Sequence, residues 1–318
     1  MKFSHNQNTY KLIAYLLGVI FLATSASSFA KPTVIKLGYQ ETIWGSPAMV
    51  AVARKVWKNS GIKVKPVVLS SGKAVRDATL GGSVDIGSLG ATPFIVGAAK
   101  SNLVTVGTVA YAGKTLSLIG KKGKVNNVKQ LKGKAIGSKL GSSTNQILVT
   151  KVLPALGLKK GHYKIDNVGF SDQVSALSNG SISAFAGVEP FNTLAIKNGI
   201  GVELANFGKY DMSPLFLGMK RSFYVKHRKA VAAFVKGWKK AVKYYNDRLE
   251  QSAKLVNNKF KEKGLNLPTD VIANSMKEMD VTTKYRKGLD GYITKQLKGL
   301  HMLDKKQKVL NSLIKTYQ

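Results

Sequence analysis

Short alternating segments and amphipathic segments follow one another along the first third of the chain after residue 30. A strand alternates apolar and polar residues with a period of two, whereas a helix repeats its apolar residues every three or four positions. The predicted strands span 34–39, 61–69, 84–89 and 103–111, and the predicted helices span 47–58, 72–80 and 93–100. This alternation indicates an α/β unit with a mainly parallel sheet.

The pattern starts again near residue 116 and predicts a second α/β unit. Its strands are expected at 116–121, 134–137, 163–168 and 184–188, with a short turn or helix at 128–131 and helices ending near 156, 179 and 198. From residue 226 the pattern becomes helical, with apolar residues such as Val231, Phe234 and Trp238 three or four positions apart. Pro268 ends that run, and further helices are expected to the end of the chain.

The N-terminus has the pattern of a secretory signal. Lys2 and Lys11 precede an apolar run over 12–23, and small residues lead to Ala30. The run is shorter than the roughly 20 residues that a membrane-spanning helix needs. We therefore predict that residues 1–30 are a cleaved signal peptide and that the mature chain is periplasmic. Because there is no Cys, lipid attachment at the cleavage site, disulfides and thiolate metal sites are excluded.

The chain is strongly basic, with 50 Lys and Arg against 16 Asp and Glu. Such a charge has two interpretations: a secreted protein that binds polyanions such as nucleic acid, or a solvated coat of lysines. Arginine, whose planar guanidinium suits base and phosphate recognition, occurs at six scattered positions only. We favour the solvated coat, expect no nucleic-acid partner, and note that such a coat could steer small anions to the protein.

Catalytic and cofactor motifs are missing. The sequence has no G-x-S-x-G, H-E-x-x-H, P-loop or usable G-x-G-x-x-G pattern, and its four histidines are dispersed. We therefore expect no catalytic residues, no metal and no cofactor.

Three predicted helices begin with glycine and hydroxyl residues directly after a strand. The N-terminus of a helix presents free N–H groups and a partial positive charge, so it can bind an anion without a buried cation. In open α/β sheets such turns gather at the carboxyl ends of the strands, where ligands bind. The alternative is that each is an ordinary N-cap. The candidate residues are Ser71 and Gly72, Ala91 and Thr92, and Gly141, Ser142, Ser143 and Thr144.

Four residues near predicted strand ends complete the candidate ligand-binding set: Gln40, Trp44, Tyr111 and Glu189. In so acid-poor a chain, Glu189 suggests a cationic group on the ligand, although a salt bridge to a lysine is an equal alternative. Trp44 and Tyr111 could pack on methylene groups of the ligand, although aromatic residues more often belong to the core.

Four segments resemble one known family. They are SSGKAVRDATLGGSVDIGSLGATPFIVGAAK (70–100), LKGKAIGSKLGSSTNQILVTKVLPALGL (131–158), FSDQVSALSNGSISAFAGVEPFNTLA (170–195) and LGMKRSFYVKHRKAVAAFVKGW (217–238). Together they are similar to the nitrate/sulfonate/taurine group of periplasmic solute-binding proteins of ABC importers. The likeness covers nearly all of the mature chain, and within the group it is strongest to members that bind taurine.

The resemblance implies a two-lobed type II periplasmic-binding-protein fold with two crossover strands, expected near 112–115 and 214–218. Lobe 1 would comprise 31–112 and 217–318, and lobe 2 would comprise 113–216. A small sulfonate, taurine first, would lie in the cleft and be delivered to an inner-membrane permease by a monomeric receptor. Nitrate, an alkanesulfonate or a thiamine-precursor pyrimidine are alternative ligands of the same fold. Related pyrimidine-making proteins consume a histidine, and no histidine here adjoins a predicted turn of the cleft.

Overall fold

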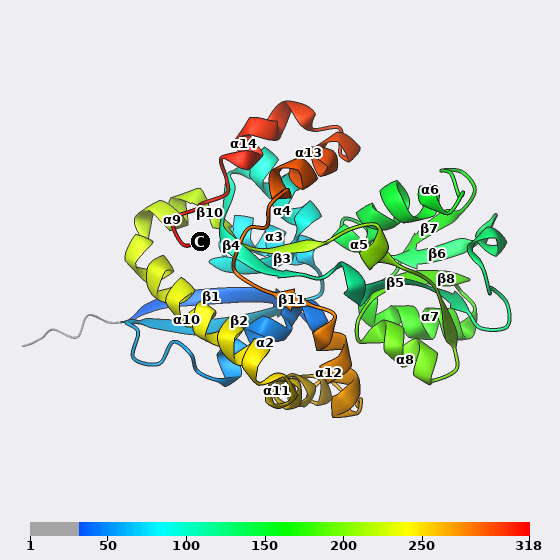
Figure 1. Ribbon diagram of the computed structural model, residues 1–318, viewed down its shortest axis with the longest axis horizontal. Helices are drawn as coiled ribbons and strands as arrows, with labels where there is room; N and C mark the ends of the chain where they lie inside the picture. Colours follow the sequence, from blue (N-terminus) through cyan, green and yellow to red (C-terminus); the bar gives the residue numbers. More distant parts are fainter. Residues whose placement is uncertain (1–31) are drawn as a thin grey trace, which may run out of the picture. The chain divides into compact units, whose positions relative to one another are not determined.

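The computed structural model describes residues 32–318 and contains two β-sheets with helices around each (Figure 1). The predicted signal segment lies outside the described residues. No helix within residues 32–318 is long and apolar enough to span a membrane. We call the first sheet with its helices lobe 1 and the second sheet with its helices lobe 2.

The sheet of lobe 1 has six strands in the order β11-β4-β10-β3-β1-β2. They are β1 (Thr33–Gln40), β2 (Ile62–Leu69), β3 (Ile86–Gly90), β4 (Leu103–Tyr111), β10 (Pro214–Lys220) and β11 (Asp280–Val281). The sheet of lobe 2 has five strands in the order β7-β6-β8-β5-β9. They are β5 (Leu116–Lys121), β6 (Ala135–Ser138), β7 (Lys164–Asn167), β8 (Ala184–Val188) and β9 (Gly201–Asn206).

Most strands of each sheet run in one direction, as predicted, but both sheets also contain antiparallel strands that the sequence pattern did not indicate. Strand β1 pairs in parallel with β2 and β3, and β6 pairs in parallel with β7 and β8, as the strand–helix alternation requires. Strands β10 and β11 join the first sheet antiparallel, and β5 lies antiparallel between β8 and β9. These strands are next to partners distant in sequence, so local patterning could not reveal their direction.

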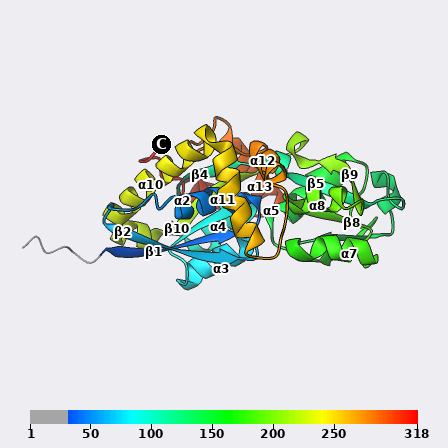
Figure 2. The same ribbon diagram turned by 90° about the horizontal axis from the view of Figure 1, so that it is seen from below.

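Helices cover both faces of the first sheet (Figure 2). Those of lobe 1 are α2 (Ser46–Ala53), α3 (Gly72–Gly81), α4 (Ala91–Ser101), α9 (Arg221–Lys226), α10 (Arg228–Asp247), α11 (Leu249–Lys261), α12 (Thr269–Lys277), α13 (Leu289–Gly299) and α14 (Lys306–Leu310). Those of lobe 2 are α5 (Ser143–Ile147), a π-helical segment (Leu148–Val152), α6 (Leu153–Ala155), α7 (Gln173–Asn179) and α8 (Phe191–Lys197). Short 3₁₀ turns lie at Ile43–Gly45, Gly113–Thr115, Val128–Leu131, Phe170–Asp172, Phe207–Lys209 and Leu303–Lys305.

Most elements lie where the sequence pattern predicted them, and the differences have local causes. The helix expected over 47–58 ends at Ala53, and Lys55 and Asn59 have positive φ in the turns that follow. Strands β9 and β11 were not predicted. Strand β11 has two residues, too few for a periodic signal.

The chain passes between the sheets twice. The first passage, after β4, includes the predicted 112–115 segment. The second passage lies at 210–213, because β10 already begins at Pro214 and is paired with β3 and β4. The predicted second crossover at 214–218 is therefore misplaced by a few residues. Leu215, Phe216 and Leu217 are fully buried there as part of the first sheet.

Helix α10 shows how the apolar stripe read from the sequence becomes core. Phe234 and Trp238 are completely buried, and Phe234 stacks on Trp57 with ring centroids 5.1 Å apart. Gly237 lets the helix approach Trp57, because a Cβ at this position would lie 2.3 Å from Trp57 Cδ1. The Trp57 indole is fixed by a 2.9 Å hydrogen bond to the carbonyl of Phe234.

We expect Gly237→Ala to lower the free energy of unfolding by about 1–3 kcal/mol, the usual cost of overpacking a core. The matched control is Gly291→Ala in α13, where an added Cβ meets nothing within 4 Å. That change should be neutral or raise stability by up to about 1 kcal/mol. Denaturant unfolding of both variants measures the difference. Equal changes in the free energy of unfolding would show that close packing against Trp57 does not require glycine at position 237.

Candidate functional site

The first turns of α4 and the α5 helix, from different lobes, are in direct contact. Ser143 Oγ accepts a 3.0 Å hydrogen bond from the backbone N–H of Thr92. Gly90 makes this approach possible, since a Cβ at that position would lie 2.5 Å from Ser143 Oγ. Two of the predicted hydroxyl-rich helix starts therefore face one another.

Two hydroxyl groups at this contact are buried without a partner. Thr144 is completely buried and Thr92 is 5% exposed, and neither hydroxyl oxygen has a hydrogen-bond partner among the described residues. Ser138, at the carboxyl end of β6, is in the same situation. Leaving a buried polar group unpaired costs about 1–3 kcal/mol. Such groups beside two helix N-termini are suited to an anionic ligand that accepts hydrogen bonds.

The other predicted serines behave as ordinary N-caps. Ser71 Oγ accepts from the N–H of Ala74 at 3.2 Å, and Ser142 Oγ accepts from the N–H of Asn145 at 3.1 Å. As acceptors these side chains satisfy the helix ends, and their O–H groups remain available as donors. The N-cap alternative thus describes Ser71 and Ser142, whereas Ser143, Thr144 and Thr92 have other surroundings.

Glycines and an aromatic ring bring the remaining residues of the turns close together. A Cβ at Gly72 would lie 3.4 Å from Gly90 N and 3.7 Å from Gln40 Nε2. Gly141 has φ +78°, and a Cβ there would lie 2.9 Å from Cδ of Lys73 in α3. Trp44 lies against Gly90, and its Nε1 donates a 2.7 Å hydrogen bond to Thr115 Oγ1 at the first passage between the lobes. We call residues 40, 44, 71–72, 90–92 and 141–144 the turn cluster; Ala91 in it is 1% exposed.

Tyr111, at the end of β4, contacts the C-terminal segment. Its hydroxyl accepts a 2.8 Å hydrogen bond from the N–H of Arg286, and the guanidinium of Arg286 lies 4.3 Å from its ring centroid. Tyr111 lines a cavity of about 510 Å³ beside the two passages, together with Lys114 and Asp211. The structure thus gives this tyrosine a role in joining the C-terminal segment to β4.

Glu189 caps a helix of lobe 2. Its carboxylate accepts from the N–H of Thr193 at 3.2 Å, at the start of α8. Burial raises the pKa of Glu189 above its ordinary value, and hydrogen bonding to Thr193 offsets part of that effect. The side chain lines a cavity of about 260 Å³ with Asp270 and Glu278 of the α12 region, and no lysine of the described residues pairs with it.

A larger cavity of about 520 Å³ lies between the lobes next to the turn cluster. Lobe 1 contributes Glu41, Thr42, Ser70, Phe260 and residues 263–265, and lobe 2 contributes Lys139, Asn167, Phe191 and residues 169–172. These residues flank the predicted ones, since Thr42, Ser70 and Lys139 lie within two positions of Gln40, Ser71 and Gly141. Lys139 and Asn167 follow or end parallel strands, so the strand-end rule could have found them. Phe260 lies at the end of α11 and Lys263 two residues after it, and no local signal marks them.

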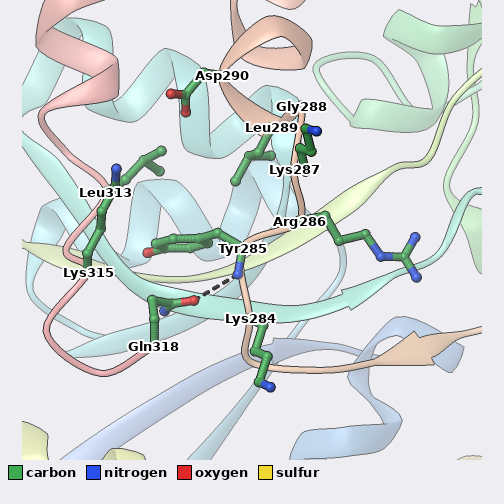
Figure 3. A pocket seen from close by; sticks show the side chains of 10 residues that line it. All are labelled: Lys284, Tyr285, Arg286, Lys287, Gly288, Leu289, Asp290, Leu313, Lys315 and Gln318. Carbon is green, nitrogen blue, oxygen red and sulfur yellow. Dashed lines mark hydrogen bonds between the residues drawn. The ribbon is translucent and has the colours of Figure 1, made fainter.

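A further cavity of about 450 Å³ lies within lobe 1, around Tyr285 (Figure 3). Tyr285 donates its N–H to Gln318 Oε1 at 2.7 Å and its hydroxyl to the carbonyl of Thr105 at 3.0 Å. All lining residues lie in 284–290 and 313–318, so a movement of one lobe against the other would not change it. The interlobe cavity is therefore the better candidate for a ligand.

Comparison with known proteins identifies the family. Residues 28–258 match the model of the NMT1-like family. The chain belongs to this family. It is 30% identical over 263 residues to a Bacillus subtilis protein named for binding aliphatic sulfonates, covering 78% of each chain. It is 29% identical to an Escherichia coli protein of the same description, covering 87% of this chain and 85% of the relative. The E. coli taurine-binding periplasmic protein is 27% identical, covering 71% and 68%.

Solved structures confirm the predicted two-lobed periplasmic-binding-protein fold for this NMT1-like chain. The alkanesulfonate-binding protein of Xanthomonas axonopodis pv. citri, bound to MOPS, matches with a TM-score of 0.77 at 21% identity, covering 90% of this chain and 100% of that one. The nitrate-binding protein of Synechocystis matches with a TM-score of 0.73 at 15% identity, covering 89% and 86%. The sequence relatives are binding proteins, which confirms the expectation that the chain is not an enzyme.

The raised pKa of Glu189 predicts a pH-dependent effect on stability. Below the ordinary value of 4.5 the carboxyl is neutral in both states, and as pH rises the unfolded chain ionises first. The wild type should therefore lose stability relative to Glu189→Gln as the pH rises above about 4, until the carboxyl of the folded protein has also ionised. Glutamine keeps an oxygen that can accept from Thr193.

Denaturant unfolding of both proteins across this range measures the effect. Glu250→Gln, on the exposed first turn of α11, is the control. A stability difference between wild type and Glu189→Gln that does not change with pH would show that the carboxylate is not held in a desolvated environment.

Proposed function

We propose that this NMT1-like protein is a periplasmic solute-binding receptor of an ABC importer that captures a small organic sulfonate between its lobes. The observation that carries the proposal is the turn cluster, in which two helix N-termini from different lobes face one another with the unpaired hydroxyls of Thr92 and Thr144. Capture and delivery to an inner-membrane permease then need only closing and opening of lobe 1 against lobe 2 about the passages at 112–115 and 210–213.

A sulfonate fits the chemistry of the turn cluster. It carries one negative charge over three oxygens, so several N–H and O–H donors can bind it together. Neutral donors held by helix ends are preorganised and allow the ligand to leave, whereas a lysine would be mobile and strongly hydrated. The adjoining cavity of about 520 Å³ provides room for an organic group, which nitrate lacks.

The organic group separates two candidate ligands. Glu189, expected to bind the ammonium group of taurine, instead accepts from Thr193 and lines a cavity with α12 residues. This favours an aliphatic sulfonate without an ammonium group, in line with the two relatives named for aliphatic sulfonates. Taurine is the second candidate, because Glu41 and Asp172 also line the interlobe cavity and a third relative is named for taurine.

Calorimetric titration with ethanesulfonate, taurine and nitrate tests the proposal. Thr92→Val and Thr144→Val remove one hydroxyl each and nearly conserve shape. Each should weaken sulfonate binding by about 0.5–3 kcal/mol, the range for a lost hydrogen bond to a neutral or charged group. Thr294→Val, at a partly exposed position of α13 whose hydroxyl donates to the carbonyl of Asp290, should leave the affinity unchanged. Binding of nitrate but of neither sulfonate, or sulfonate binding that both valine variants leave intact, would contradict the assignment.

The same titrations with Glu189→Gln decide between the two sulfonates. If Glu189 binds an ammonium group, its loss should weaken taurine roughly 100-fold, at about 1.4 kcal/mol per tenfold, and spare ethanesulfonate. The geometry of Glu189 predicts instead that the ratio of the two affinities does not change. A selective loss of taurine binding would make taurine the ligand.

A further inference from the structure

The lobe 2 helix that begins at Ser143 contains an irregular turn. We call residues 143–155 the ligand helix; they comprise α5, the π-helical segment Leu148–Val152 and α6. In the π segment the N–H of Leu153 donates to the carbonyl of Leu148, five residues earlier. A regular α-helix would use the residue four earlier, so this turn holds one additional residue.

Pro154 accounts for the irregular turn. A proline inside a helix has no N–H to donate to the carbonyl four residues earlier, here that of Thr150, and its ring crowds that carbonyl. Widening the preceding turn relieves the crowding, and such wide turns are frequent at functional sites.

The additional residue changes which face Lys151 occupies. At about 100° per residue, a regular helix would place Lys151 about 80° around the axis from Ser143. Lys151 lies inside the widened turn, where the rotation per residue is smaller, so it is closer to the face of Ser143, which contacts α4 of lobe 1. Gln146, on the same helix, donates its amide to the carbonyl of Gly299 in α13 of lobe 1 at 3.3 Å.

Lys151 meets a completely buried carboxylate at the second passage between the lobes. Its Nζ lies 2.5 Å from Asp211 Oδ2, which also accepts from Gln296 Nε2 at 3.1 Å. Asp211 Oδ1 accepts from the hydroxyl of Tyr292 at 3.0 Å and from the N–H of Ser213 at 2.6 Å. The ammonium group of Lys151 also lies 5.1 Å from the ring centroid of Tyr292.

These contacts join three parts of the molecule through one charge. Tyr292 and Gln296 belong to α13 of lobe 1, Lys151 belongs to the ligand helix of lobe 2, and Asp211 lies on the chain between them. Gly113 of the first passage packs directly against the backbone of Asp211, since a Cβ at position 113 would lie 1.9 Å from the carbonyl oxygen of Asp211. We call Lys151, Asp211, Tyr292 and Gln296 the hinge clamp.

We propose that Lys151 and Asp211 are positioning residues: their ion pair holds the ligand helix in the orientation that presents Ser143 and Thr144 to α4. Among the four donors to Asp211, only Lys151 comes from lobe 2, so opening the lobes removes that donor and leaves the carboxylate with three. The buried charge of Asp211 therefore favours the arrangement in which the turn cluster is assembled. This deepens the proposed function and rests on it only for the affinity measurement below.

Distances between the lobes test the clamp without any ligand. The chain has no cysteine, so spin labels can be attached to Lys65→Cys in β2 and Lys132→Cys in lobe 2, both exposed. Lys151→Met, which keeps the aliphatic stem and removes the charge, should shift the distance distribution in pulsed electron resonance. Lys160→Met, at an exposed lysine after the ligand helix, should match the unsubstituted labelled protein. An identical distribution for all three would overturn the proposal.

Affinity for ethanesulfonate is the second readout. Lys151→Met should weaken binding by about tenfold or more, which is about 1.4 kcal/mol per tenfold. Lys151→Arg should restore part of it, and Lys160→Met should have no effect. A Lys151→Met protein that is only easier to unfold, with unchanged distances and affinity, would show a purely structural role and overturn the proposal. If the parent protein bound no sulfonate while the distances still responded, the proposed function would fail and the clamp would stand.

Discussion

The hydrogen bond from the N–H of Thr92 to the hydroxyl of Ser143 joins two helices that begin at the carboxyl ends of strands in separate sheets. Its geometry requires that β3 and β6 direct their ends toward each other, that Gly90 carry no side chain, and that both helices start at these residues. This contact depends on the relative positions of the two lobes. Those positions are set by the passages between the sheets, by the ligand helix and by the C-terminal helices. Because a helix end attracts anions, this contact is the basis of the anionic ligand proposed above.

The hydroxyl groups around this contact comprise helix caps and unpaired groups. Ser71 and Ser142 are used as caps, which satisfies the helix ends that would otherwise be buried without partners. Thr92 and Thr144 remain unpaired at the same place. Most lysines of this strongly basic chain lie on the exposed surface, where they act on anions through long-range attraction.

Asp211 illustrates the opposite arrangement, a buried charge that is fully paired. Desolvating a carboxylate is expensive, and the cost is recovered only when the geometry of its partners is good. Four donors from three parts of the chain meet it, and burial together with the nearby Asp211 charge raises the pKa of Tyr292 well above its ordinary value, so this hydroxyl remains a donor. Such a group favours one relative arrangement of its neighbours, which suits a position between two lobes.

The sequence by itself determined the α/β class, the restart near residue 116, most strands and helices, and the hydroxyl-rich helix starts, because each depends on patterns within about ten residues. Only the tertiary structure decided which hydroxyls are caps and which are unpaired, that Glu189 accepts from Thr193, and that Tyr111 lies beside Arg286. It also placed Phe260 and Lys263 in the interlobe cavity and Lys151 on Asp211. These contacts join residues tens to more than a hundred positions apart, or depend on side-chain direction, and neither leaves a local pattern.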